Sequence, residues 1–293
     1  MKQDQVFDLI RSLVDGDKQK IDIGFNRMIR DLGNTNGAYR LQRIYDSYKN
    51  NTGKLIELPQ ALKSFVCENY KEVFMDNLLL NDTIIEFLET IRKEWSYRKE
   101  LREQGLTNSN RVLLVGPPGN GKTSFAIALA GYLEITPYIA VTNKLIDSHL
   151  GESEKNVINL IQNIPPQGLL FLDEFDTLGT SRTDDTASTG RAYNNIVNSL
   201  LMSLDRLPED VVFVAATNRD DLLDSAVHRR FDVVLSFPDP TIEQKEMYVK
   251  QYMKRKAIQL PFDKEKIEKC TSYSDLEHEA VRVHKQCILS GLL

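Results

Sequence analysis

The fold is decided by the stretch Gly116-Pro117-Pro118-Gly119-Asn120-Gly121-Lys122-Thr123. It matches G-x-x-x-x-G-K-[ST], a loop between a buried strand and a helix whose backbone N–H groups hold nucleotide phosphates. The apolar run at 111–115 has the length of a strand, and the apolar run that begins at Ser124 is typical of a helix. The stretch therefore predicts an ATP site at residues 116–124, with Lys122 at the β- and γ-phosphates and Thr123 as a ligand of Mg²⁺.

The composition is that of a globular chain. Its 293 residues allow one large or two modest domains, and 41% of them are hydrophobic, which is ample for a core. Neither a membrane-spanning segment nor a secretory signal is visible, so we expect a cytoplasmic protein without a membrane partner. The net charge of −5 disfavours a surface built to grip nucleic acid, although a local basic groove is compatible with it.

The two ends of the chain show only helical patterns. Residues 1–80 carry apolar side chains at helical spacing without strand-like alternation, which predicts an all-helical N-terminal domain. Because no catalytic or ligand-binding motif is recognisable in this domain, we assign the domain to docking of a client or partner. Residues 241–293 predict a small helical lid, with helices expected at 241–256, 263–270 and 274–290.

The middle region, residues 81–240, begins with a helix and continues as alternating strands and helices. Residues 81–83 can cap a helix that runs from 84 to about 104. Strands are expected after it at 111–115, 137–141, 168–173, 211–216 and 233–237. This alternation predicts a parallel α/β sheet of the phosphate-loop NTPase type.

Polar side chains follow two of the expected strands. The apolar run at 168–172 ends in Asp173 and Glu174, and the next strand ends at Asn218. The carboxyl edge of a parallel sheet is where ligands bind, so these groups are expected beside the phosphate loop. We predict that Asp173 holds Mg²⁺, that Glu174 polarises the attacking water and that Asn218 orients this water against the γ-phosphate.

Two adjacent arginines precede the last expected strand. Arg229 and Arg230 carry guanidinium groups suited to stabilising phosphoryl charge, and they are predicted to act in trans, on a neighbouring subunit. For paired arginines in isolation a solvated or salt-bridged surface is the usual interpretation. The order of the motifs favours the catalytic role here.

Taken together, these motifs resemble the AAA+ ATPase family, and specifically the central AAA clade that includes katanin, spastin and the AAA proteases. The resemblance spans roughly 100–290 and rests on GPPGNGKT at 116–123, GESEKNV at 151–157, LLFLDEFD at 169–176, AATN at 215–218 and RRFD at 229–232. It implies an AAA+ α/β core with a helical lid, and ATP bound between subunits of a homo-oligomeric ring, typically a hexamer, whose pore pulls on a polypeptide. It also implies that Arg229 and Arg230 are arginine fingers and that Asn218 senses the nucleotide state.

The chain departs from the family pattern at the expected pore. A large aromatic residue is common two positions before the Gly of G-E-S, and His149 occupies that place here, followed by Leu150. His149 and Leu150 are our candidate pore contacts, with a solvated loop histidine as the alternative. A second pore loop is expected within 181–191. The chain therefore lacks the standard aromatic contact with a threaded substrate at this position.

Three functions therefore stay open. The favoured one is an ATP-driven remodeller of protein clients that can serve a separate effector enzyme, including in a bacterial defence system. A nucleic-acid motor or helicase loader would use the same chemistry at ATP, but the G-E-S-E context and the acidic balance favour protein. The third is a nucleotide-dependent assembly switch that threads nothing. A GTPase is disfavoured because Ile146 stands where the base-reading N-K-x-D motif needs Asp.

Overall fold

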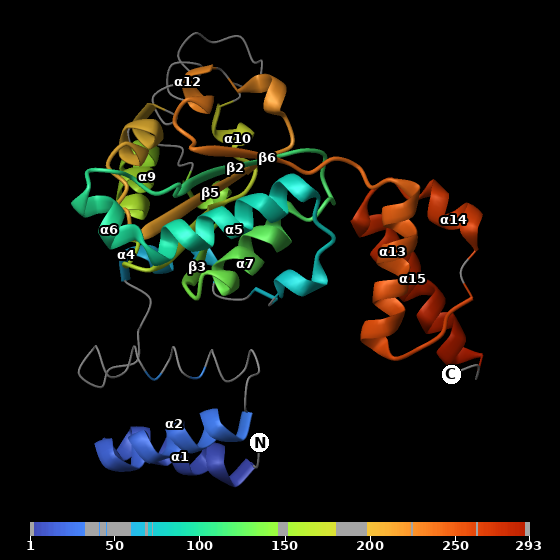
Figure 1. Cartoon of the computed structure of the whole chain (residues 1–293), viewed down its shortest axis with the longest axis horizontal. Helices are drawn as coiled ribbons and strands as arrows, with labels where there is room; N and C mark the ends of the chain where they lie inside the picture. Colours follow the sequence, from blue (N-terminus) through green and yellow to red (C-terminus); the bar gives the residue numbers. More distant parts are fainter. Residues whose placement is uncertain are drawn as a thin grey trace. The chain divides into compact units, whose positions relative to one another are not determined.

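The chain divides into two units, Met1–Pro59 and Gln60–Leu293. Figure 1 shows the computed structural model, which describes residues 3–32, 41, 45, 60–67, 70–71, 73–145, 152–179, 198–223, 225–261 and 263–290. The division into three domains at 1–80, 81–240 and 241–293 stays a prediction.

The described part of the first unit is a helical hairpin. Helix α1 (Gln3–Asp15) and helix α2 (Lys18–Leu32) lie side by side (Figure 1). Their apolar faces bury Leu9, Ile21, Phe25 and Met28, and the Tyr45 ring stacks on Phe25 with ring centroids 5.1 Å apart. The amphipathic pattern read from the sequence thus forms a small core of its own.

The second unit is built on a six-stranded, mostly parallel sheet, which confirms the α/β fold predicted from the sequence. Its strands are β1 (Val66–Cys67), β2 (Arg111–Val115), β3 (Thr136–Ala140), β4 (Gly168–Leu172), β5 (Val211–Thr217) and β6 (Val233–Ser236). They are ordered β1-β3-β4-β5-β2-β6. Among the strands that the structure describes, only β1, which the sequence pattern did not predict, runs antiparallel to its neighbour β3. The five predicted strands are present within one residue of their expected bounds.

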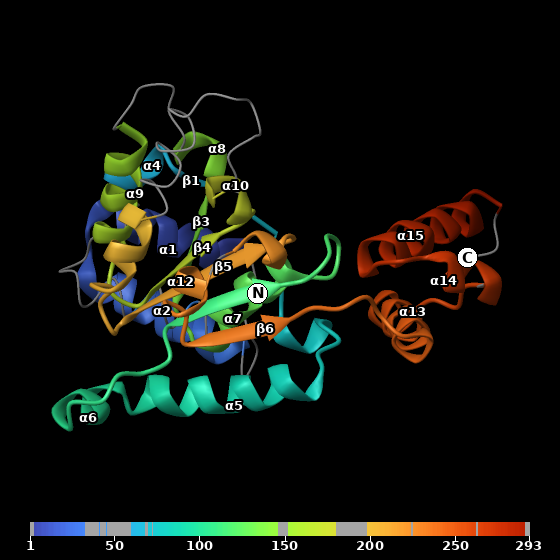
Figure 2. The same ribbon diagram turned by 90° about the horizontal axis from the view of Figure 1, so that it is seen from above.

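Helices cover both faces of this sheet. Right-handed crossovers place α7 (Lys122–Tyr132), which leads from β2 to β3, on one face. They place α9 (Glu152–Gln162), the helical residues 198–204 and α12 (Ser225–His228) on the other face, because these connections run in the opposite direction across the sheet. Figures 1 and 2 show these layers.

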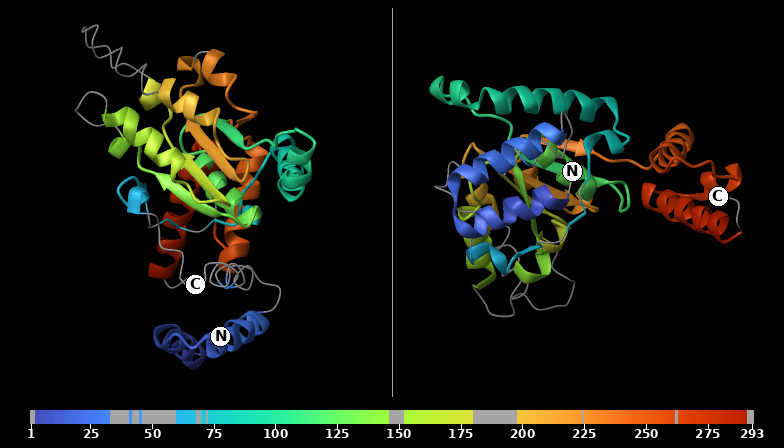
Figure 3. Two further views of the ribbon diagram at one scale, coloured as in Figure 1. Left: turned by 90° about the vertical axis from the view of Figure 1, so that its left-hand side faces the viewer. Right: turned by 90° about the horizontal axis from the view of Figure 1, so that it is seen from below.

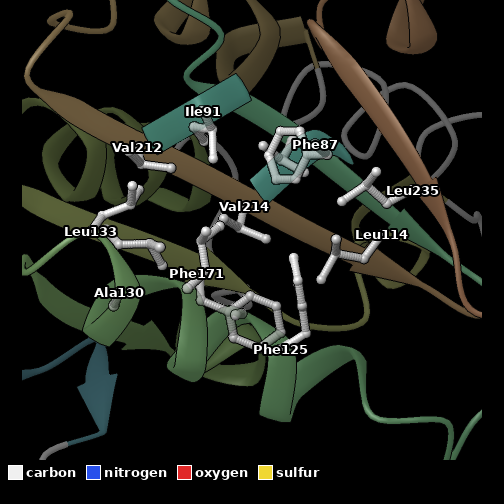
Figure 4. Packing of buried hydrophobic residues seen from close by; sticks show 14 of the residues in the cluster. Phe87, Ile91, Leu114, Phe125, Ala130, Leu133, Phe171, Val212, Val214 and Leu235 are labelled. Carbon is white, nitrogen blue, oxygen red and sulfur yellow. The ribbon is translucent and has the colours of Figure 1, made fainter. Parts of the chain in front are cut away.

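The main core fills the space between the sheet and the pair α5 (Asp82–Ser96) and α7. Figure 4 shows Phe87 and Ile91 of α5 and Phe125 of α7 converging on side chains of the strands, such as Leu114 and Val214. Strands buried on both faces read as continuous apolar runs, which is why the phosphate-loop strand was legible in the sequence. The motif loop therefore extends from a rigid platform.

The long helix expected from 84 to about 104 is interrupted. Helix α5 begins after the N-cap Asn81, whose side-chain oxygen accepts a hydrogen bond from Ile84 N at 2.9 Å, and ends at Ser96. Tyr97, with φ −99° and ψ 14°, separates α5 from α6 (Arg98–Glu103). The N-terminal cap was predicted correctly, whereas one continuous helix was wrong.

Three helices follow the sheet, as predicted for the lid. They are α13 (Ile242–Lys256), α14 (Lys264–Lys269) and α15 (Tyr273–Leu289), coloured orange to red in Figure 3. Capping boxes at Thr241 and Ser272 fix the starts of α13 and α15. Their apolar sides pack together around Tyr252, Ala280 and Val249.

Short elements complete the unit. These are α4 (Gln60–Lys63), α8 (Thr142–Leu145), α10 (Asp176–Gly179) and the 3₁₀ turns η1 (Met75–Asn77) and η2 (Asp220–Leu222). Within the described ranges, none of the helices combines the length and apolar character needed to cross a bilayer.

Candidate functional site

The phosphate loop connects the end of β2 to the start of α7, as the sequence predicts. Its backbone strongly favours glycine at Gly116, where φ is +143° and an added Cβ would lie 2.9 Å from the carbonyl carbon of Phe237 and closer still to its oxygen. Gly121, with φ +90°, is the N-cap of α7. The loop therefore delivers the N-terminus of an apolar helix to the carboxyl edge of the sheet, which is an anion-binding arrangement.

Lys122 is the buried cation of this loop. Its Nζ donates to Gly116 O at 2.6 Å, to Pro117 O at 2.8 Å and to Asn218 Oδ1 at 2.7 Å. Only 6% of the residue is exposed. Burial lowers the pKa of the Lys122 ammonium, while the negative charges of Asp173 and Asp176 act in the opposite direction. The structure thus brings the predicted phosphate-binding lysine and the predicted Asn218 into direct contact.

Thr123 and Asp173 form the candidate metal position. Thr123 Oγ1 donates to Asp173 Oδ2 at 2.7 Å, so the first turn of α7 and the end of β4 meet. Asp173 is itself held, because Thr142 Oγ1 donates to its carbonyl at 2.7 Å and Glu174 N donates to its Oδ1 at 2.9 Å. A hydroxyl and a carboxylate are hard oxygen donors of the kind that Mg²⁺ prefers, so these two residues fit the metal that the phosphate loop implies.

Glu174 lies beside this pair in an unusual backbone conformation. Its φ of 51° is in the left-handed region, which a non-glycine residue adopts at some energetic cost. The residue is exposed and lines the same cavity as Lys122, Thr123 and Asp173. Residues at strained positions of this kind gather at functional sites, so the geometry is compatible with the water-polarising role expected of Glu174.

The cavity over the phosphate loop has a volume of about 600 Å³. It is lined by the loop residues from Pro118 to Ser124 together with Asp173, Glu174 and Asn218. The sequence motifs did not predict the rest of its wall, which carries no recognisable pattern. This wall consists of Lys71, Val73, Asn77 to Leu80, Ile127, Phe237, Tyr248, Arg255, Tyr273, Ser274 and Glu277.

The lid touches the tip of the phosphate loop directly. Ser274 N donates to Gly119 O at 3.0 Å, and a Cβ added at Gly119 would lie 2.8 Å from Ser272 Oγ. In addition, Asn120 Nδ2 donates to Asp239 Oδ1 at 2.8 Å, in the segment that leads from β6 to α13. Both contacts were missed from the sequence, because they join positions far apart in the chain.

The two arginines lie at the other edge of the sheet. Asp232, which follows them, donates its N–H to Arg111 O at 2.9 Å and forms an ion pair with the Arg111 guanidinium at 2.6 Å. Arg111 begins β2, and the phosphate loop follows the last residue of this strand. About 13 Å of strand therefore separates Arg111 from the phosphate loop. Arg229 and Arg230 are exposed, and Arg230 is 3.3 Å from Asp205. The structure does not bring them to the phosphate loop of their own chain.

The candidate pore contacts lie outside the described residues. They are His149, Leu150 and the second pore loop expected at 181–191.

Comparison with known proteins identifies similar chains. Residues 112–239 match the sequence model of the ATPase family associated with various cellular activities (AAA). An uncharacterised AAA family ATPase, y4kL of Sinorhizobium fredii, is 34% identical over 210 residues, which cover 71% of this chain and 62% of that protein. Proteasome-activating nucleotidases are also similar: that of Aeropyrum pernix is 32% identical over 82% of this chain and 60% of its own length. That of Pyrococcus furiosus is 31% identical over 70% and 54%. The chain thus spans less than two thirds of the length of these relatives.

Proposed function

Because the chain belongs to the AAA family of ATPases through residues 112–239, we propose that it hydrolyses ATP at the phosphate loop and uses this reaction to remodel protein clients. The observation that carries the proposal is the convergence of three strand ends on this loop. Val115 precedes the loop, Asp173 contacts Thr123 and Asn218 contacts Lys122. The ends of β2, β4 and β5 therefore meet at this loop, which supports binding of a γ-phosphate there.

The residues divide the work of phosphoryl transfer. Lys122 and the N–H groups of the loop bind the phosphates and hold them in position. When bound at Thr123 and Asp173, Mg²⁺ supplies positive charge that offsets the charge of the transferring group. Glu174 accepts a proton from the attacking water, and Asn218 orients this water once the nucleotide has displaced its contact with Lys122.

We further propose that the active site is completed by a second copy of the chain in a homo-oligomeric ring, with six subunits as the expected number. Arg229 and Arg230 are too far from the phosphate loop of their own chain to contact it, because they lie near the first residue of β2. Both are exposed, so a neighbouring subunit can meet them. An arginine supplied in trans stabilises the transition-state charge and couples hydrolysis to assembly.

Protein clients are favoured over nucleic acid. The similar proteins from Aeropyrum and Pyrococcus are named as activators of a proteasome, a machine that degrades protein. The net charge of −5 also gives no general attraction for a phosphate backbone. We assign docking of the client, or of a separate effector enzyme, to residues 1–80, in which the described hairpin exposes Phe7, Ile10 and Ile23.

The test is the Glu174→Gln variant, which keeps the shape of the side chain and removes the base. We expect ATP binding to persist and turnover to fall at least about 100-fold, since general-base catalysis contributes this order of magnitude. Light scattering with ATP and Mg²⁺ should then show a ring, and a bound polypeptide should co-purify with it. Turnover at the wild-type rate would refute the role of Glu174.

The same experiment separates the remaining functions. A ring that captures no protein, combined with DNA binding that weakens steeply with salt, would favour the motor or loader function. A ring that captures neither would favour an assembly switch.

A further inference from the structure

The segment between the sheet and the lid is fixed to the tip of the phosphate loop by one side-chain hydrogen bond. Asn120 Nδ2 donates to Asp239 Oδ1 at 2.8 Å. Asn120 is 4% exposed, and its own Oδ1 is buried without a hydrogen-bond partner among the described residues. Among the residues that the structure describes, the Asn120 side chain thus makes one hydrogen bond, and its acceptor is Asp239.

Asp239 is held in a stiff stretch of backbone. It stands between Pro238 and Pro240, which fix their own φ angles, and a residue that precedes proline is restricted to extended conformations. Just before it, Phe237 N donates to Val115 O at 2.8 Å, and the Phe237 ring packs edge-on against Phe125 of α7 at 5.3 Å. These contacts hold the segment against β2 and α7, which flank the phosphate loop.

The first lid helix begins almost immediately afterwards. Thr241 is the N-cap of α13, so only Pro240 lies between Asp239 and this cap. Because only one residue intervenes, a displacement of Asp239 also displaces the start of α13. The neighbouring loop residue, Gly119, contacts the start of α15 through Ser274. Two adjacent residues of the phosphate loop thus contact the segment before α13 and the start of α15.

We propose that Asn120 and Asp239 are positioning residues that couple occupancy of the phosphate loop to the position of the lid. We call their hydrogen bond the hinge clasp. The inference rests on the proposed nucleotide-binding function, but neither side chain needs to contact the nucleotide. When phosphates order the loop backbone, Asn120 becomes fixed, Asp239 follows and the start of α13 is held. Without the clasp, the loop and the lid would respond to nucleotide separately.

The experiment uses the full chain, ADP with Mg²⁺ as the probe, and two readouts. Isothermal titration calorimetry gives the Kd for ADP, and hydrogen exchange with mass spectrometry gives the protection of residues 241–247 with and without ADP. For Asp239→Ala we expect the Kd to rise about three- to tenfold, because the binding-competent loop is less populated. We expect the ADP-dependent protection of 241–247 to fall below about half of its wild-type value.

A reciprocal exchange of the two side chains tests the contact itself. Asn120→Asp places two carboxylates against each other and should abolish the ADP-dependent protection of 241–247. Adding Asp239→Asn to this variant restores an amide donor facing a carboxylate, with the direction of donation reversed, and should restore the protection. Rescue of this kind distinguishes coupling from a general loss of packing.

Control variants keep the outcome interpretable. Asp263→Asn makes the same change at the N-cap of α14, which is part of the lid, and asparagine caps helices as well as aspartate does. It should behave as wild type in both readouts. If Asp239→Ala fails to fold by circular dichroism, the nearly isosteric Asp239→Asn takes its place, with an effect of the same sign and smaller size.

The possible results separate the two proposals. Wild-type protection and wild-type Kd in the Asp239 variants, or a double variant no better than Asn120→Asp, would overturn the hinge clasp and leave ATP binding intact. A wild-type chain that binds no ADP would overturn the proposed function, and the clasp with it.

Discussion

Replacing Gly116 by alanine should destabilise the Gln60–Leu293 unit by about 4 kcal/mol. The backbone at this position has φ +143°, a conformation that costs an L-residue about 2 kcal/mol. The new methyl group would also lie 2.9 Å from the carbonyl carbon of Phe237. That carbonyl cannot move away freely, because Phe237 N is bonded to Val115 O at 2.8 Å, and forced overpacking adds about 2 kcal/mol.

A second glycine of the same loop supplies the control. Gly121 has φ +90°, but an added Cβ there would meet no atom within 4 Å. Gly121→Ala should therefore cost only the backbone contribution, about 1–2 kcal/mol. The difference between the two variants isolates the contact with Phe237.

The assay is urea unfolding followed by tryptophan fluorescence. Trp95 is the only tryptophan of the chain and is 7% exposed in the main core, so its emission reports the unit that contains the phosphate loop. For Gly116→Ala we expect the midpoint to fall by roughly 1–1.5 M. Equal midpoints for the two variants would refute the argument, since they would mean that the close approach to Phe237 carries no energy.

Three further predictions concern the metal, the arginines and pH. Thr123→Ala should raise the Mg²⁺ concentration for half-maximal ATPase activity at least about tenfold, whereas Thr123→Ser should not; equal shifts would contradict the metal assignment. Mixing Arg230→Ala subunits with Lys122→Ala subunits should restore ATPase activity that neither has alone, and no recovery would contradict action in trans. Hydrogen bonding, chiefly from the Thr271 hydroxyl, lowers the pKa of Asp275 from about 3.8 to about 2, so its stabilisation is present above pH 4 and is lost towards pH 2. Asp275→Asn should remove about 1 kcal/mol of that acid sensitivity in urea titrations, allowing for solvent screening; an unchanged pH slope would contradict this.

The sequence was informative wherever a pattern repeats locally. The strand at 111–115 was recognised because it is apolar at every position between its ends and leads into a glycine-rich loop. The N-cap Asn81 was recognised for the same kind of local reason, since its side chain bonds to a backbone group three residues away. Both features depend on residues that lie within a few positions of each other, so the sequence alone indicates them.

The sequence did not predict features that depend on contacts between residues far apart in the chain. Strand β1 has only two residues, too few to show a period, and it exists because Val66 pairs with Ala140. The break at Tyr97 interrupts a stretch that looks helical throughout. The contact between Asn120 and Asp239 spans 119 positions, so neither residue could indicate the other. The roles expected of the site residues stay predictions.

The three hydrogen bonds of Lys122 determine what a measured nucleotide affinity reports in this protein. The ammonium already has Gly116 O, Pro117 O and Asn218 Oδ1 as acceptors, which between them match its three N–H donors. A phosphate oxygen can reach this cation only by replacing one of them, so binding is an exchange of acceptors rather than the addition of a new one. The measured affinity therefore reports a difference between two sets of hydrogen bonds. The acceptor that leaves, if it is Asn218, becomes available to a water molecule at the moment the substrate arrives.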